Sequence, residues 1–84
     1  MNIYVSNLGF STQSEDLNTQ FARYGEVSSV NIIMDKVTNR SRGFAFVEMA
    51  DNNSAEKAIR ELNGTNLDGR IIKVNEAREK KSSY

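Results

Sequence analysis

The side chains with the clearest potential for chemistry lie in residues 42–49, which read Arg-Gly-Phe-Ala-Phe-Val-Glu-Met. Side chains alternate between the two faces of a β-strand, so Phe44 and Phe46 share one face with Arg42. The opposite face is small or apolar and suits a core: Ala45, Val47 and Met49. Two uncovered aromatic rings beside a cation suit the stacking of nucleobases next to a phosphate, whereas folding alone does not require them.

A second strand near the N-terminus repeats this pattern. In Asn2–Ser6, Ile3 and Val5 point toward the core and Tyr4 points outward. Stacking on an aromatic ring contributes about 1–3 kcal/mol per base, and every base has a flat face to offer. Bases paired in a duplex keep those faces buried, so three converging rings favour a single-stranded nucleic acid.

Residues 3–8 and 42–49 resemble the hexamer and octamer motifs of the RNA recognition motif family. The octamer pattern is matched at every specified position except the last, where Met49 replaces an aromatic residue on the core side. The resemblance implies that Tyr4 and Phe46 stack on neighbouring bases and that Phe44 packs on the sugars. It also implies that Arg42 pairs with a phosphate. The chain further resembles the compact single-motif RNA-binding proteins of bacteria.

Further candidates for RNA contact surround these rings by position: Asn31, Ile33, Glu48, Lys73, Asn75, Glu76, Ala77 and Arg78, with Lys36 and Arg40 before the octamer. The polar groups among them would supply specificity. For each single charged residue, an ordinary solvated role is equally open. Gly43 either admits a close approach of chain or ligand or marks a strand bulge.

The elements that position these residues follow from periodicity and capping signals. Residues 12–23 are expected to form a helix opened by a capping box of Thr12 and Glu15. Its buried stripe is Leu17, Phe21 and Tyr24, and Gly25 suits its C-terminus. The next predicted strand is Val27–Met34, with Val30 and Ile32 inside and Asn31 and Ile33 outside. Residues 35–41 are expected to form an exposed, mobile hairpin loop.

The second half of the chain repeats the order of strand, helix and strand. Residues 54–62 predict a helix capped by Asn53 and Glu56, with an apolar stripe and an end at Asn63 and Gly64. The apolar stripe comprises Ala55, Ala58, Ile59 and Leu62. An Asp68-Gly69 turn precedes a last strand at residues 71–75, with Ile72 and Val74 inside.

This order predicts an α+β fold, the ferredoxin-like βαββαβ sandwich: a four-stranded antiparallel sheet with two helices on one face. The resemblance implies that the two motif strands are its central pair. We expect one domain over residues 1–77, followed by a short flexible tail over residues 78–84.

The composition limits the chemistry that this chain of 84 residues can perform. It has no Cys and no His, so thiolate nucleophiles, imidazole bases, disulfides and the usual zinc ligands are excluded. Acylphosphatase-like catalysis on the same fold needs a cation in the loop after the first strand, and no cation occurs between that strand and Arg23. We therefore expect a non-enzymatic domain without metal or cofactor.

The partner and the location follow from the same features. The expected ligand is single-stranded RNA, with single-stranded DNA possible in vitro, bound by a monomer. No run is long enough to span a bilayer and no secretory signal precedes the first strand, so we expect no membrane contact and a cytoplasmic location. The alternative is a protein-interaction module in which the same face docks a protein or is covered by the C-terminal tail.

Overall fold

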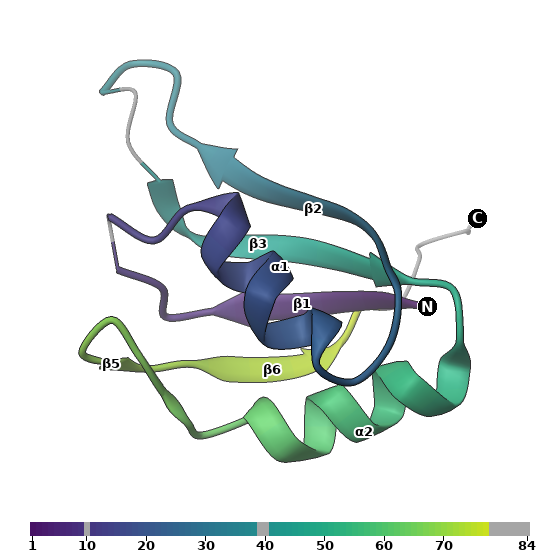
Figure 1. Cartoon of the computed structure of the whole chain (residues 1–84). Coiled ribbons are helices and arrows are strands. Elements are labelled where there is room, and N and C mark those ends of the chain that lie inside the picture. The colour runs from purple at the N-terminus through teal and green to yellow at the C-terminus, as the bar shows by residue number, and fades with distance from the viewer. Residues whose placement is uncertain (10, 39–40, 78–84) are drawn as a thin grey trace.

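The computed structural model describes residues 1–9, 11–38 and 41–77, and for residues 41 and 42 only the backbone. The elements are β1 (Asn2–Ser6), α1 (Ser14–Ala22), β2 (Val27–Met34), β3 (Ser41–Met49), α2 (Asn52–Leu62), β4 (Asn66–Leu67), β5 (Arg70–Ile71) and β6 (Lys73–Glu76). The four-stranded sheet has the order β2-β3-β1-β6 and is antiparallel throughout (Figure 1). The predicted ferredoxin-like fold is confirmed, with β3 and β1 at the centre.

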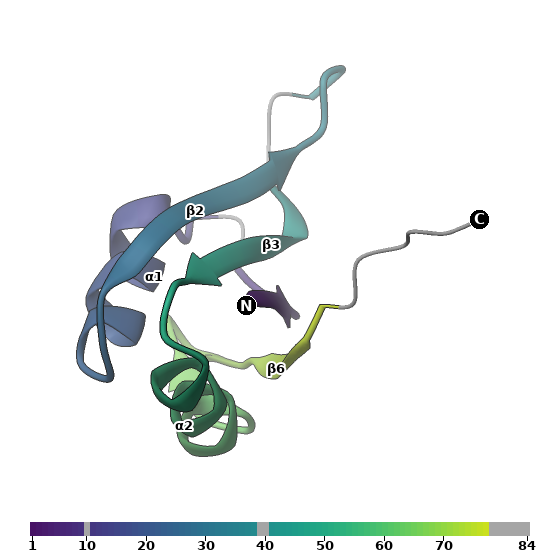
Figure 2. The same ribbon diagram turned by 90° about the vertical axis from the view of Figure 1, so that its right-hand side faces the viewer.

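The core lies between the sheet and its two helices, which cover the same face (Figure 2). Strand alternation buries Ile3 and Val5 of β1 completely, and it does the same for Ala45, Val47 and Met49 of β3. Helix α1 adds Leu17 and Phe21, and Tyr24 packs at the edge as expected. The remaining core residues are Leu8, Ala55, Ala58, Leu62, Ile72 and Val74. No helix formed by the described residues covers the other face of the sheet.

Helix α1 begins later than the capping signal predicts. Its N-cap is Gln13, whose N–H donates to the Asp16 carboxylate at 2.9 Å, so the capping box expected from Thr12 and Glu15 is wrong. Thr12 is only 4% exposed, and its hydroxyl donates to the carboxylate of Asp68 at 3.3 Å. A tertiary hydrogen bond to the β4–β5 hairpin therefore takes up the hydroxyl that was expected to cap the helix.

Helix α2 is capped by Asp51, and the expected capping box of Asn53 and Glu56 is also wrong. The Asp51 carboxylate accepts from the Ser54 hydroxyl at 2.6 Å and from the Ser54 backbone N–H at 3.0 Å. These bonds stabilise the ionised form and lower the pKa of the Asp51 carboxyl below its usual range. The cap therefore stabilises the fold above about pH 4 and weakens as the pH falls through the lowered pKa.

We expect the wild-type protein to lose more stability than Asp51→Asn when the pH is lowered from about 6 to about 2. Asparagine caps helices about as well as aspartate but does not titrate, so the variant keeps the hydrogen-bonding role without its pH dependence. Urea unfolding midpoints of both proteins at several pH values measure this. Parallel midpoint curves would contradict the assignment of Asp51 as the titrating cap.

Gly25 has a packing role that differs from the expected helix C-terminal role. Its φ is not in the left-handed region, and the residue that caps α1 is Arg23. A Cβ at Gly25 would lie 2.6 Å from the Cβ of Ser54. The absence of a side chain therefore lets the connection from α1 to β2 pack directly against the start of α2.

The last strand is shaped by the α2–β4 connection. The predicted Asp68-Gly69 turn is confirmed, because both residues have positive φ, 56° and 82°, as a type I′ hairpin requires. Ile72 interrupts the predicted single strand: its N–H donates to Thr65 O at 2.9 Å. The strand then resumes as β6 and extends through Glu76, one residue beyond the expected end.

Within the described residues, neither helix combines the length and the apolar composition that a bilayer span requires. The same part of the chain contains no group of three His, Cys, Asp or Glu residues arranged to hold a metal ion.

Candidate nucleic-acid interface

One row of residues crosses all four strands on the open face of the sheet. Tyr4 of β1 pairs with Phe46 of β3 on one side and with Asn75 of β6 on the other. Phe46 pairs in turn with Asn31 of β2. Residues directly opposite one another in antiparallel strands have Cβ atoms about 4.5–5.5 Å apart. The structure thus brings four predicted site residues into one continuous row, with two rings in the middle and an amide at each end.

The three predicted aromatic residues form a single cluster. The Tyr4 ring centroid lies 5.5 Å from that of Phe46 and 5.8 Å from that of Phe44, and both pairs are tilted. Phe44 and Phe46 meet edge to face at 6.4 Å. Phe46 is 37% exposed, and Tyr4 and Phe44 are half-buried. These mutual contacts hold the rings in place and leave ring surface uncovered for a ligand.

Two further rows flank the aromatic row, and each contains polar side chains. In the first, Ser6 pairs with Phe44 and with Lys73, whose side chain is exposed. In the second, Glu48 pairs with Asn2 of β1 and with Ser29 of β2.

Sequence reasoning missed three residues of these rows: Asn2, Ser6 and Ser29. Asn2 and Ser6 have the same strand parity as Tyr4, and that signal was sufficient to find them. Ser29 likewise has the parity of Asn31, and the register of β2 is regular from Ser29 to Ile32, so the same signal applied to it.

Gly43 lies in an irregular part of β3. Ile32 of β2 pairs with Ala45 of β3, and Met34 pairs with Ser41. From the first pair to the second, β2 moves by two residues and β3 by four, so the register shifts. Gly43 has φ +90°, which L side chains rarely adopt, and its carbonyl accepts from Leu8 N–H at 2.9 Å. The bulge interpretation is therefore confirmed, and it coincides with a close approach of the chain.

Because of the bulge, strand alternation does not predict on which face of the sheet the Arg42 side chain lies. Side chains alternate between the two faces from Phe44 to Met49, and the irregular stretch before Phe44 interrupts this alternation. The Arg42 side chain lies outside the described residues, as do Arg40 and Arg78. Their predicted phosphate contacts therefore stay predictions.

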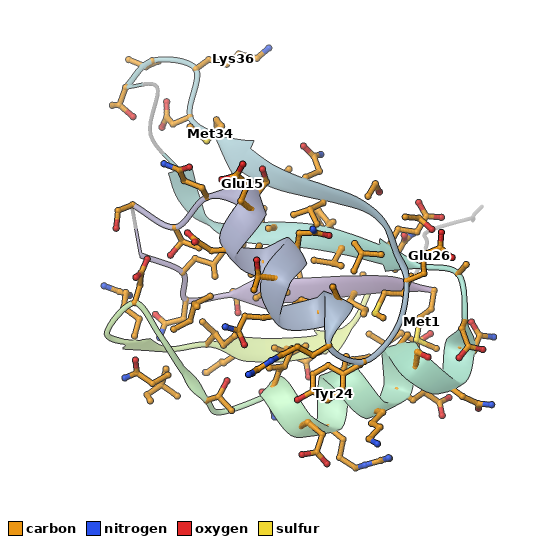
Figure 3. The ribbon with its side chains drawn as sticks, in the orientation of Figure 1. Met1, Glu15, Tyr24, Glu26, Met34 and Lys36 are labelled. Atoms are coloured by element: carbon orange, nitrogen blue, oxygen red, sulfur yellow. The ribbon has the colours of Figure 1, made fainter. Side chains whose placement is uncertain are left out.

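Four other predicted residues lie outside the row formed by Asn31, Phe46, Tyr4 and Asn75. Glu76 is exposed and pairs with the buried Ile3, so its position in the register belongs to the helix-covered face. Ala77 is half-buried, and its N–H donates to Asn2 O at 2.9 Å. Lys36 is exposed and lies near the tip of the β2–β3 connection, beyond the sheet (Figure 3). Ile33 is half-buried at the end of β2.

Charge is distributed unequally along the strands. Lys36 follows the end of β2, and Lys73 lies at the same end of the sheet, opposite Ser6. Glu26 lies at the other end (Figure 3), where Glu48 also occurs opposite Asn2. A polyanion crossing the open face therefore meets the Lys73 ammonium near one end of the sheet and the Glu48 carboxylate near the other.

Comparison with known proteins finds similarity to RNA-binding proteins. A family model described as RNA recognition motif matches residues 3–73. The putative RNA-binding protein RbpE of Nostoc is 45% identical over 78 residues, which cover 93% of this chain and 79% of that protein. The crystal structure of RNA binding protein PG1 superposes with a TM-score of 0.91 at 48% identity, covering 98% of this chain and 99% of the other.

A plant relative is considerably longer. Glycine-rich RNA-binding protein 8 of Arabidopsis thaliana is 44% identical over 79 residues, which are 94% of this chain and 47% of that protein. The chain thus spans about half the length of this relative. The family model and the names of these relatives indicate a non-enzymatic domain, which confirms that prediction.

Proposed function

The chain belongs to the RNA recognition motif family, and from this premise we propose that it binds a short stretch of single-stranded RNA across the open face of its sheet. The observation that carries the proposal is the cluster of Tyr4, Phe44 and Phe46, whose ring centroids lie 5.5–6.4 Å apart on a face without helices. Two relatives are named as RNA-binding proteins, which supports RNA as the ligand.

The rings supply affinity through stacking. Bases stack on the exposed parts of Tyr4 and Phe46, while Phe44 packs against sugars. Each stacked base contributes about 1–3 kcal/mol, and stacking tolerates any base. Duplex RNA cannot use the stacking surface, because its base faces are already buried in the helix, and should bind far more weakly.

Cations at the β2–β3 end of the sheet hold the phosphates. Lys73 is exposed next to the aromatic row, and Lys36 extends from the neighbouring connection. Arg42, Arg40 and Arg78, whose side chains lie outside the described residues, are further candidates for phosphate contacts. The chain as a whole has a formal net charge of zero, so we expect few phosphate contacts and a modest salt dependence.

The remaining parts of the proposal concern the state of the protein. Residues 1–77 form the binding domain and act as a monomer, and the tail expected at residues 78–84 lies outside the described residues. The protein works in the cytoplasm, and single-stranded DNA is a second ligand in vitro.

Titration with a mixed pool of short single-stranded RNA tests the proposal. We expect shifts of the backbone amide NMR signals of Tyr4, Phe44, Phe46 and Asn75, because these residues form the binding surface. The amides of Leu17 and Ile59, on the helices, are the internal control and should not move. Duplex RNA of matched sequence should give a far weaker response.

If neither single-stranded RNA nor DNA moves the signals of the central strands, the proposed function is wrong. Shifts confined to α1 and α2 would also contradict it, because they would place the ligand on the other side of the sheet. A protein partner for the open face would then be sought by affinity capture.

A further inference from the structure

The open face carries one acidic side chain among its described residues, and that side chain lies next to the ring cluster. Glu48 follows Phe46 by two positions on β3, so both point to the same face about 6.6 Å apart along the strand. The side chain is exposed, and no described basic side chain forms an ion pair with it. Its carboxylate is thus open to a ligand group beside the stacking platform.

The chemistry of a carboxylate restricts what can lie over it. An ionised carboxylate only accepts hydrogen bonds, and it repels the phosphates of RNA. Covering it with a group that cannot donate would cost free energy through lost hydration. A base stacked on Phe46 must therefore present hydrogen-bond donors toward Glu48.

Guanine fits this requirement better than the other bases. Its Watson–Crick edge carries two adjacent donors, N1–H and the 2-amino group, which a carboxylate can accept together in a bidentate, charge-assisted pair. Adenine and cytosine each offer one amino group beside a ring nitrogen that accepts. Uracil offers one N–H between two carbonyl oxygens, which the carboxylate repels.

The residues beside Glu48 supply the hydrogen-bond donor that guanine O6 requires. Guanine O6 lies beside N1–H and needs a donor. Asn2 and Ser29 are both paired directly with Glu48, one on each adjacent strand, and they carry an amide and a hydroxyl. One donor from Asn2 or Ser29 for O6, followed by the two carboxylate oxygens for N1–H and the 2-amino group, is the complement of the edge that guanine presents.

We propose that the row of Asn2, Glu48 and Ser29 selects guanine for the base stacked beside it. This inference rests on the proposed function, since it assigns a base to the RNA bound by the ring cluster. It adds base selectivity to that function. Stacking gives affinity for any base, whereas this row discriminates between bases.

Fluorescence anisotropy with short oligouridines that carry one variable nucleotide tests the inference. Wild-type protein should bind the guanosine-containing oligomer about 5- to 100-fold more tightly than the all-uridine oligomer, the range of one bidentate contact between a side chain and a base. Replacing guanosine with inosine, which lacks the 2-amino group, should remove most of this preference.

Two variants separate the role of Glu48 from general charge effects. Glu48→Gln should lose the guanosine preference, so that its affinities for the guanosine-containing and the all-uridine oligomers become about equal. Glu56→Gln, which changes the same charge on the exposed face of α2, should behave as wild type.

An unchanged guanosine preference in Glu48→Gln overturns the inference, and so does a wild-type preference for uridine or an equal affinity for guanosine and inosine. In each of these cases the protein still binds RNA, so the proposed function survives. Failure of the wild-type protein to bind any of the oligomers overturns both.

Discussion

Replacing Ile72 with alanine should lower the free energy of unfolding by about 2–5 kcal/mol. Ile72 is 1% exposed, and its backbone is tied to the α2–β4 connection, so little chain movement can fill the cavity left by the missing methyl groups. The free energy lost is the transfer energy of those groups plus the cavity term. Denaturant unfolding followed by circular dichroism measures the change.

The adjacent residue is a matched control. Ile71 is the same residue type but is 52% exposed, so Ile71→Ala should change stability by about half a kcal/mol. Equal losses from the two substitutions would show that the chain does not place Ile72 in the core and Ile71 on the surface.

Replacing Phe46 with alanine should weaken binding of single-stranded RNA by about 1–3 kcal/mol, which is the contribution of one stacked base. The loss of folding stability should be smaller, about 1 kcal/mol. The ring is 37% exposed, and its partners are the rings of Tyr4 and Phe44, whose contacts with it are each worth about 0.5–1.5 kcal/mol. Anisotropy titrations and denaturant melts on the same preparation separate the two effects.

Phe46→Tyr and Phe46→Leu are the controls for this substitution. Tyrosine keeps the flat ring and should retain most of the affinity, whereas leucine keeps apolar volume but loses the stacking surface. If leucine binds RNA as well as phenylalanine does, the ring contributes only apolar area and stacking is not the source of affinity. A stability loss for Phe46→Ala as large as that for Ile72→Ala would show that the ring is part of the core.

The aromatic cluster and the strands that carry it could be predicted well from sequence. Strand alternation depends only on backbone geometry, so β1 and β2 begin and end at the predicted residues. In β3, Ala45 and Val47 alternate with two phenylalanines. This alternation identified the core face and the open face of the strand. The Asp68-Gly69 turn was equally readable, because both residue types tolerate the positive φ that the hairpin needs.

Helix starts were predicted less well, since several polar residues near each start can cap. Both predicted capping boxes were wrong, and in both cases the observed cap lies within two residues of the expected one. For α1 the reason is tertiary: the Thr12 hydroxyl donates to Asp68, 56 residues away in the chain. No local signal reports such a competing partner.

The sequence by itself determined which side chains are available for stacking and that Tyr4, Phe44 and Phe46 lie on the open side of their strands, because parity within a strand is a local property. Only the tertiary structure decided which residues meet across strands. It aligned Asn31, Phe46, Tyr4 and Asn75 in one row and placed Glu48 between Asn2 and Ser29. Register between strands depends on bulges, here at Gly43 and before Ser29, and a one-residue shift there changes every neighbour.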